Sequence, residues 1–211
     1  MLTLRELWIV HPEREACAAF EARFAGLPGV RVHATRFADL PAHDAFVTAG
    51  NAYGIMTAGI DAAVVAHFGE SLMRHVQRHI IGHYLGEQPI GTAFLAPTGD
   101  PWCPWLVHTP TMRLPGSIAG TDAVYRATWA ALLALHQHRP ATDDESPIEV
   151  VAMPAMGCGF GGMSFDESAR QMAAAYRHAL RPPTSLGTSW DLPLSRERLI
   201  CFDGDTPRAH R

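Results

Sequence analysis

Short apolar runs rich in β-branched residues alternate with longer helical patterns along the chain. This alternation is typical of strands that are connected through helices, so it predicts an α/β fold. Strands are expected at 4–10, 30–37, 44–49, 91–96, 105–109, 148–155 and 198–202. Helices are expected at 13–25, 121–138 and 164–180, and the run 60–84 is expected to form one or two more.

Local signals mark several element boundaries. Thr121 is a candidate N-cap, and Ser164 with Glu167 three residues later has the spacing of a capping box. The turn TGDPWCP joins two predicted strands, and the acidic segment RPATDDESP (139–147) is expected to be a solvated or disordered loop. The sequence shows no internal repeat.

The chain has 211 residues, of which 47% are hydrophobic and 18% charged. This length suits one buried core, so we expect one domain over 1–211, with its core at 3–203 and a loose tail at 204–211. The formal net charge is -4, which disfavours binding to duplex nucleic acid. All 17 basic residues are Arg, so lysine Schiff-base chemistry and lysine-dependent phosphate loops are excluded.

The four cysteines, Cys17, Cys103, Cys158 and Cys201, lie far apart and form no CxxC pair. Their spacing suggests neither a disulfide framework nor a zinc site, and favours reduced thiols. The first residues lack the pattern of a signal peptide, and no apolar run reaches membrane-spanning length. We therefore expect a cytoplasmic protein that does not contact membranes.

His75, His79 and His83 recur at a spacing of four residues, which places them on one side of a predicted helix. This spacing could serve a metal, but no nearby Cys, Asp or Glu completes a closed site, and Arg74 and Arg78 add positive charge. A solvated helix face is the favoured interpretation, and we predict no metal and no cofactor.

Two loops are candidates for ligand binding because each connects a predicted strand to a helix. They read TAGNAYGIMTAGID and MGCGFGGMS. In the second loop, Gly157, Gly159, Gly161 and Gly162 would let backbone N–H groups converge on an anion such as a diphosphate, next to a helix N-terminus. A structural turn is the alternative. Neither GxxxxGK[ST] nor a GxGxxG after the first strand occurs, which disfavours an ordinary kinase or dehydrogenase.

In their order and motifs these segments resemble the macro domain family. VTAGNAYGIMTAGIDAAVVAHFG is similar to the family's NAAN strand, glycine-rich stretch and hydrophobic-Asp pair, and MPAMGCGFGGMSFDESA is similar to P-A-[IM]-G-[TC]-G-x-x-G. GTAFLAPTG and WLVHTPTM resemble the intervening strands, and the likeness extends over about 37–202. The resemblance implies a three-layer α/β/α fold with a central mixed, mostly parallel sheet.

The sequence also departs from the family pattern. Thr48 replaces the first Asn of NAAN, residues 56–59 (MTAG) replace the triple glycine, and Asp39 matches the family's GDIT aspartate only at a shorter spacing. The paired glutamates of poly-ADP-ribose glycohydrolases are absent, as is the lysine of a branch with a lysine-ADP-ribose intermediate.

The resemblance implies that Asn51 binds the distal ribose of ADP-ribose and that Asp61 orients or deprotonates a water molecule, which would make them the catalytic pair. Asn51 as a turn residue and Asp61 as the first acid of a helix are the alternatives. Cys158 is interpreted as loop packing and not as a nucleophile. The implied substrate-binding residues are Asp39, Thr48, Ala49, Gly59, Ile60, Gly157, Cys158, Gly159, Phe160, Gly161, Gly162, Met163 and Phe202.

Three functions are compatible with the sequence. The first is hydrolysis of an ADP-ribosyl bond to a protein side chain, an O-acetyl group or a terminal phosphate. The second is a reader that binds ADP-ribose without turnover. The third is a protein-interaction scaffold that uses the segment 102–105 (WCPW) as an exposed anchor.

Overall fold

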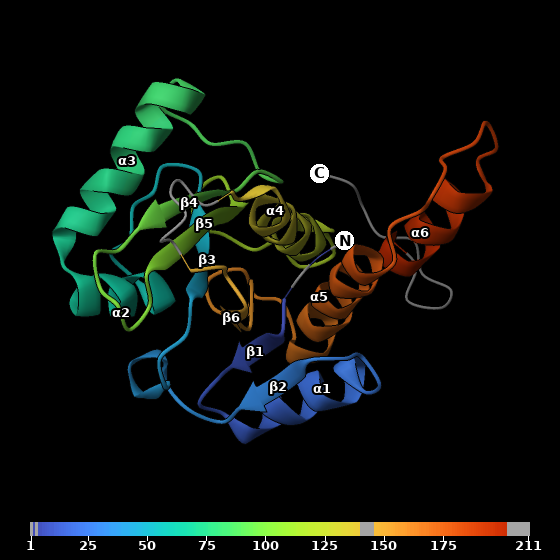
Figure 1. Ribbon diagram of the computed structural model, residues 1–211, viewed down its shortest axis with the longest axis horizontal. Helices are drawn as coiled ribbons and strands as arrows, with labels where there is room; N and C mark the ends of the chain where they lie inside the picture. The colour runs from blue at the N-terminus through green and yellow to red at the C-terminus, as the bar shows by residue number, and fades with distance from the viewer. Residues whose placement is uncertain (1, 3, 140–145, 202–211) are drawn as a thin grey trace.

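A computed structural model describes residue 2 and residues 4–139 and 146–201 (Figure 1). In chain order, its elements are β1 (Glu6–Val10), α1 (Arg14–Phe24), β2 (Val30–His33), η1 (Phe37–Asp39), β3 (Ala45–Asn51), α2 (Gly59–Phe68), α3 (Glu70–Tyr84), β4 (Phe94–Pro97), β5 (Trp105–Met112), α4 (Ala123–Gln137), β6 (Val150–Pro154), α5 (Phe165–Leu180) and α6 (Asp191–Cys201). Every element predicted before Leu180 is present, with its ends shifted by a few residues.

The described strands form one six-stranded sheet in the order β2-β1-β6-β3-β5-β4. β4 is antiparallel to β5, and the other neighbouring pairs are parallel. This confirms the predicted mixed, mostly parallel sheet. Because five of these strands run the same way, their carboxyl ends lie at one edge of the sheet, and the two candidate ligand loops meet there.

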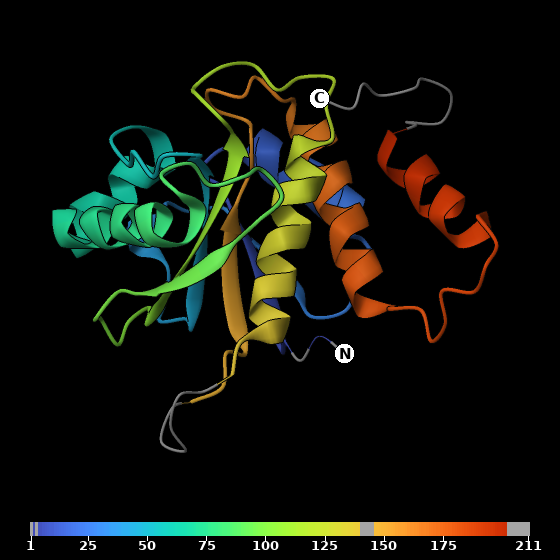
Figure 2. The same cartoon turned by 90° about the horizontal axis from the view of Figure 1, so that it is seen from above.

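Helices cover both faces of the sheet, which confirms the three-layer α/β/α arrangement (Figure 2). Side chains alternate along each strand, so Leu7 and Ile9 face the core beneath α1, α4 and α5, while Trp8 and Val10 face the core beneath α2 and α3. In β3, Val47 belongs to the first core and Phe46 to the second. Both faces of the sheet are therefore apolar. The polar groups that can contact a ligand lie in the loops at the carboxyl ends of the strands.

The run 60–84 is divided into α2 and α3 at Gly69, whose φ of +87° suits glycine. The histidines of α3 do not share one environment. The half-buried ring of His79 stacks on Phe94, with 3.8 Å between ring centroids, and on the exposed His83, with 4.0 Å between centroids. Within the residues that the structure describes, no group of three or more His, Cys, Asp or Glu side chains could hold a metal ion.

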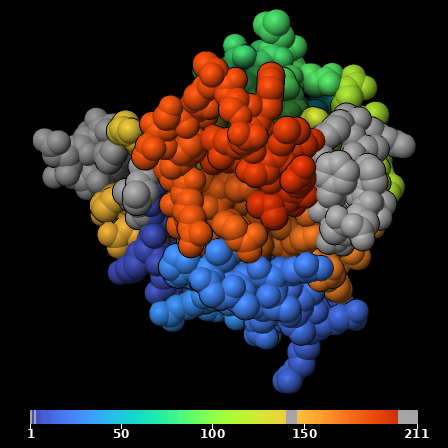
Figure 3. Space-filling view, turned by 90° about the vertical axis from the view of Figure 1, so that its right-hand side faces the viewer, coloured from blue at the N-terminus to red at the C-terminus, as the bar shows by residue number. Residues whose placement is uncertain are grey.

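The strand predicted at 198–202 is wrong, because residues 191–201 form α6. Its apolar run is too short to distinguish a strand from the last turn of a helix. Pro193 fits the first turn of α6, where a missing N–H costs nothing. Figure 3 shows α6 (red) lying over α5 (orange) on the outside of the helical layer. Phe202 and the tail 204–211 lie outside the described residues.

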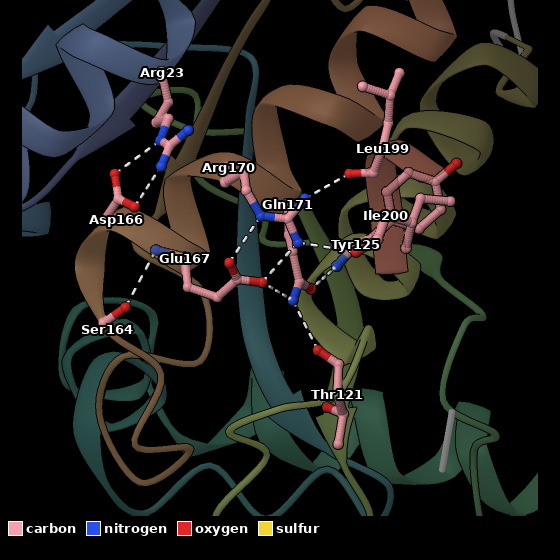
Figure 4. A network of polar contacts seen from close by, with 10 residues as sticks. All are labelled: Arg23, Thr121, Tyr125, Ser164, Asp166, Glu167, Arg170, Gln171, Leu199 and Ile200. Atoms are coloured by element: carbon pink, nitrogen blue, oxygen red, sulfur yellow. Dashed lines mark hydrogen bonds and ion pairs between the residues drawn. The ribbon is translucent and has the colours of Figure 1, made fainter. Parts of the chain in front are cut away.

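A buried polar network ties α6 and the start of α4 to α5 (Figure 4). The Arg170 guanidinium donates to both carboxylate oxygens of Glu167 at 2.8 Å and to the carbonyl of Ile200 at 2.9 Å. The Gln171 amide donates to the carbonyl of Thr121 at 2.7 Å and accepts from the N–H of Tyr125 at 2.9 Å. Arg170 thus satisfies a carbonyl at the C-terminal end of α6, where a helix has no internal donor.

The predicted helix caps are borne out in part. Ser164 accepts from the N–H of Glu167 at 3.2 Å, as the capping-box spacing predicts. α4 begins at Ala123, two residues later than expected, and the Thr121 hydroxyl accepts from the Ala123 N–H at 3.3 Å.

Two further observations concern the cysteines and possible membrane-spanning helices. Cys17, Cys103 and Cys158 are free thiols. No helix among the described residues is long and apolar enough to cross a membrane.

We predict that Arg170→Ala lowers the free energy of unfolding by about 3–5 kcal/mol, because it removes the buried guanidinium that pairs with the buried Glu167 carboxylate. Urea denaturation measures this change. Arg74→Ala is the matched control, because it breaks an exposed i,i+4 pair with Glu70 that contributes about 0.5 kcal/mol or less. Equal losses in the two variants would contradict a structural role for the buried pair.

Candidate functional site

A cavity of about 530 Å³ opens at the carboxyl edge of the sheet. Its wall is formed by residues within 10–12, 35–38, 46–63, 111–115 and 154–161, which follow or end β1, β2, β3, β5 and β6. This volume suits a ligand of nucleotide size. The parallel topology thus brings loops more than 100 residues apart in sequence to one concave site.

Most of the predicted site residues lie on this wall. They are Ala49, Asn51, Gly59, Ile60, Asp61, Gly157, Cys158, Gly159, Phe160 and Gly161. Asp39, Thr48, Gly162 and Met163 do not line the cavity. The side chain of Thr48 is fully buried, Met163 packs in the core beneath α4 and α5, and Asp39 is exposed on η1.

The glycine loop after β6 presents open backbone donors. Among the described residues, the N–H groups of Gly159, Phe160 and Gly161 make no hydrogen bond, whereas the N–H groups of Gly162 and Met163 bond back to Gly159 and Gly157. A cavity wall with unbonded N–H groups favours an anionic ligand.

Glycine is required at two positions of this loop for different reasons. Gly157 has a φ of +75°, and a Cβ there would lie 2.8 Å from Val124 and 2.9 Å from Ile118. A Cβ on Gly161 would lie 2.4 Å from the carbonyl oxygen of Gly157. Gly159, by contrast, has open space at its Cβ position.

The N-terminus of α2 lines the same cavity as the glycine loop. Its N-cap is Ala58, which has no side chain that could bond the first N–H groups. The N–H groups of Gly59, Ile60 and Asp61 make no hydrogen bond within the part of the chain that the structure describes. A helix N-terminus of this kind attracts anions. α5, whose dipole was expected to help, begins outside the cavity wall and is capped by Ser164.

Asp61 is buried in the first turn of α2 and borders the cavity. Burial raises the pKa of its carboxyl to about 7. Its Oδ1 has no hydrogen-bond partner among the described residues. A buried carboxyl that lacks a partner is costly, and it is suited to exchanging a proton near neutral pH.

The side-chain amide of Asn51 is used by its own loop. Its Oδ1 accepts from the N–H groups of Tyr53 at 3.1 Å and Ile55 at 3.2 Å, and its Nδ2 donates to the carbonyl of Ile55 at 2.8 Å. The turn role that the sequence left open is therefore present, and Asn51 also lies on the cavity wall.

Cys158 lies on the wall, but burial raises the pKa of its thiol to about 11. A thiol with so high a pKa is protonated at neutral pH and is a poor nucleophile. This agrees with its interpretation as a packing residue of the loop.

Sequence reasoning missed several wall residues: His11, Arg36, Tyr53, Ile55 and Leu114. They follow the ends of β1, β2, β3 and β5, so their position after a predicted parallel strand was the available signal. Tyr53 and Ile55 lie inside the first candidate loop, TAGNAYGIMTAGID, but were not singled out within it. No motif surrounds His11, Arg36 or Leu114, and the strand order that brings these residues together could not be read from the sequence.

Comparison with known proteins identifies the family. The family model described as Macro domain matches residues 47–172, from β3 into α5, and this range includes both candidate loops. The chain belongs to the macro domain family. This macro domain is 34% identical to an uncharacterized protein of Aeropyrum pernix over 149 residues, which cover 70% of this chain and 71% of the relative. It is 30% identical to an uncharacterized protein of Aquifex aeolicus over 135 residues, or 64% and 73% of the two chains.

Solved structures share the fold. The macrodomain of Mycobacterium tuberculosis DarG superposes with a TM-score of 0.53 at 19% identity, over 69% of this chain and 88% of that chain. A Trypanosoma brucei macrodomain in complex with ADP superposes with a TM-score of 0.53 at 17% identity, over 88% and 61% of the two chains. At these identities, the likeness shows a common fold.

We predict that Gly161→Ala destabilises the glycine loop, because its Cβ cannot fit beside the Gly157 carbonyl without a backbone shift. The expected loss is about 1–3 kcal/mol in the free energy of unfolding, measured by urea denaturation. Gly159→Ala, which points into open space in the same loop, should change stability by less than about 1 kcal/mol. Similar losses at both positions would refute the packing argument.

We predict that Asp61→Asn makes the protein more stable at pH 8 and leaves its stability near pH 3 unchanged. The folded pKa of about 7 lies above the ordinary value of 3.8, so between these values the folded state keeps a proton that the unfolded chain releases. The free energy of unfolding therefore falls as pH rises through this window, by up to about 4 kcal/mol at about 1.4 kcal/mol per pKa unit.

Urea denaturation of both proteins at pH 3 and pH 8 measures this difference. Asp39→Asn, on the exposed surface of η1, is the control and should change stability little at either pH. A stability difference for Asp61→Asn that does not change with pH would contradict the buried, raised-pKa carboxyl.

Proposed function

We propose that this macro domain binds ADP-ribose in the cavity and hydrolyses the bond between its distal ribose and an attached group. The observation that carries the proposal is that two open N–H sets, from α2 at 59–61 and from the glycine loop at 159–161, belong to residues that line one cavity. Two such sets can hold a diphosphate without a lysine, which this chain lacks. The ADP-bound Trypanosoma brucei macrodomain, which shares the fold, is consistent with a nucleoside-diphosphate ligand.

Asp61 would act on the water. In the proposed step, a water oxygen attacks the anomeric carbon of the distal ribose, and the bond from that carbon to the leaving group breaks. The Asp61 carboxylate accepts a proton from the water, and the leaving group takes up a proton, so the products are ADP-ribose and the free acceptor. With a pKa of about 7, Asp61 is largely ionised and able to act as a base at pH 8.

The rate of hydrolysis would depend mainly on how the bound substrate is placed relative to Asp61. The backbone N–H groups hold the diphosphate, and this fixes the anomeric carbon with respect to Asp61. Nothing on the cavity wall distinguishes a protein side chain, an O-acetyl group or a terminal phosphate as the leaving group, so the proposal includes all three.

A reader without turnover is the second candidate, and the bonding of Asn51 favours it. Because the Asn51 amide already makes three hydrogen bonds within its loop, it can contact a ribose only if some of these bonds are exchanged. The scaffold function has less support. The Trp102 ring packs against Phe37 and His67, and its indole N–H donates to the carbonyl of Leu40, so it is not a free anchor.

We predict that isothermal titration detects ADP-ribose binding to the wild-type protein and at least tenfold weaker binding to Gly159→Glu. The Gly159 side-chain position is open, so the added carboxylate can be accommodated and would repel the diphosphate. Gly159→Ala is the control and should bind like the wild type.

The same proteins are tested for release of ADP-ribose from a mono-ADP-ribosylated protein, together with Asp61→Ala. A hydrolase requires release by the wild type and its loss in Asp61→Ala. Binding without release would make the protein a reader, and absence of binding would leave only the scaffold.

A further inference from the structure

The strand that carries Asn51 into the cavity is irregular at that point. The pairing of β3 with β5 shifts between Gly50 and Asn51, so that Gly50 pairs with Pro110 but Asn51 pairs with Met112. The extra residue of this bulge is Thr111 on β5, and on β3 the shift falls just before the loop that forms part of the cavity wall. Bulges often re-aim side chains next to functional sites.

A buried histidine lies directly behind the bulge. His108 on β5 is fully buried, and a Cβ on Gly50 would lie 2.7 Å from its Nε2. The φ of Gly50 is not in the left-handed region, so glycine is required here by the imidazole and not by backbone strain. Burial lowers the pKa of His108 to about 3, so the ring is neutral at physiological pH.

Gln88 fixes the orientation of this ring and also contacts the Asn51 loop. Nδ1 of His108 lies 2.8 Å from Oε1 of the fully buried Gln88, whose own Nε2 donates to the carbonyl of Thr92 at 3.3 Å. This assigns the role of acceptor to Oε1 and of donor to Nδ1. The backbone N–H of Gln88 donates to the carbonyl of Ala52 at 2.8 Å.

We propose that His108 and Gln88 are positioning residues, which set the register of β3 against β5 at this bulge and so hold the loop that follows Asn51 in the cavity wall. The ring of His108 packs against Gly50. Gln88 binds this ring through its side-chain Oε1, and it binds the loop after Asn51 through its backbone N–H, which donates to Ala52. Neither residue lines the cavity, so they act through Asn51. The role of this loop in binding the ligand rests on the function proposed above.

The test uses amide hydrogen exchange at Tyr53 and Ile55, whose N–H groups bond to Oδ1 of Asn51. Gly50→Ala should speed exchange at both amides at least tenfold and weaken ADP-ribose binding, because the added Cβ collides with His108. His108→Asn keeps a side-chain donor for Gln88 but removes the ring edge. The double variant Gly50→Ala/His108→Asn should therefore recover most of the protection and affinity that Gly50→Ala loses.

Gly159→Ala, at a wall glycine with open space, is the control and should leave both amides unchanged. If Gly50→Ala does not fold, Gln88→Leu serves instead, and it should speed exchange at Tyr53 and Ile55 more than in the centre of α5. Unchanged exchange in these variants, or a double variant no better than Gly50→Ala, would overturn the proposal. Because exchange needs no ligand, a wild-type protein that fails to bind ADP-ribose would refute the proposed function separately.

Discussion

The parallel pairing of β3 with both β5 and β6 is the constraint on which the site depends. It places the carboxyl ends of β3 and β6 side by side, although the loops that follow them are about 100 residues apart in the chain. The helices on both faces bury the sheet, so its edge is the place where backbone polar groups can stay open. The cavity and its unbonded N–H groups follow from this arrangement.

Backbone N–H groups supply the donors on which the proposed anion site rests, and Arg36 also lines the cavity. The chain has no lysine, and the two open sets of N–H groups belong to a helix capped by alanine and to a loop in which glycine is required. The buried Asp61 carboxyl on the same wall costs stability at neutral pH, because the fold raises its pKa. Such costs are common at functional sites.

Features with a local cause were predictable from the sequence. The alternation of apolar runs predicted the α/β layers, and the glycines at 157–161 predicted a loop that could approach a ligand. α6 was not predictable, because a contact that holds its C-terminal end comes from Arg170, which lies about 30 residues earlier and donates to the carbonyl of Ile200. The fit of His108 against Gly50 was hidden for the same reason, since the two residues meet only when β3 and β5 pair.

The most direct test of the central claim is the amide spectrum of ¹⁵N-labelled protein during titration with ADP-ribose. Our account predicts that the resonances of 59–61 and 159–161 shift together and saturate at one equivalent, because both sets of N–H groups contact one diphosphate. Shifts confined to only one of these segments, or to residues outside the cavity, would contradict it.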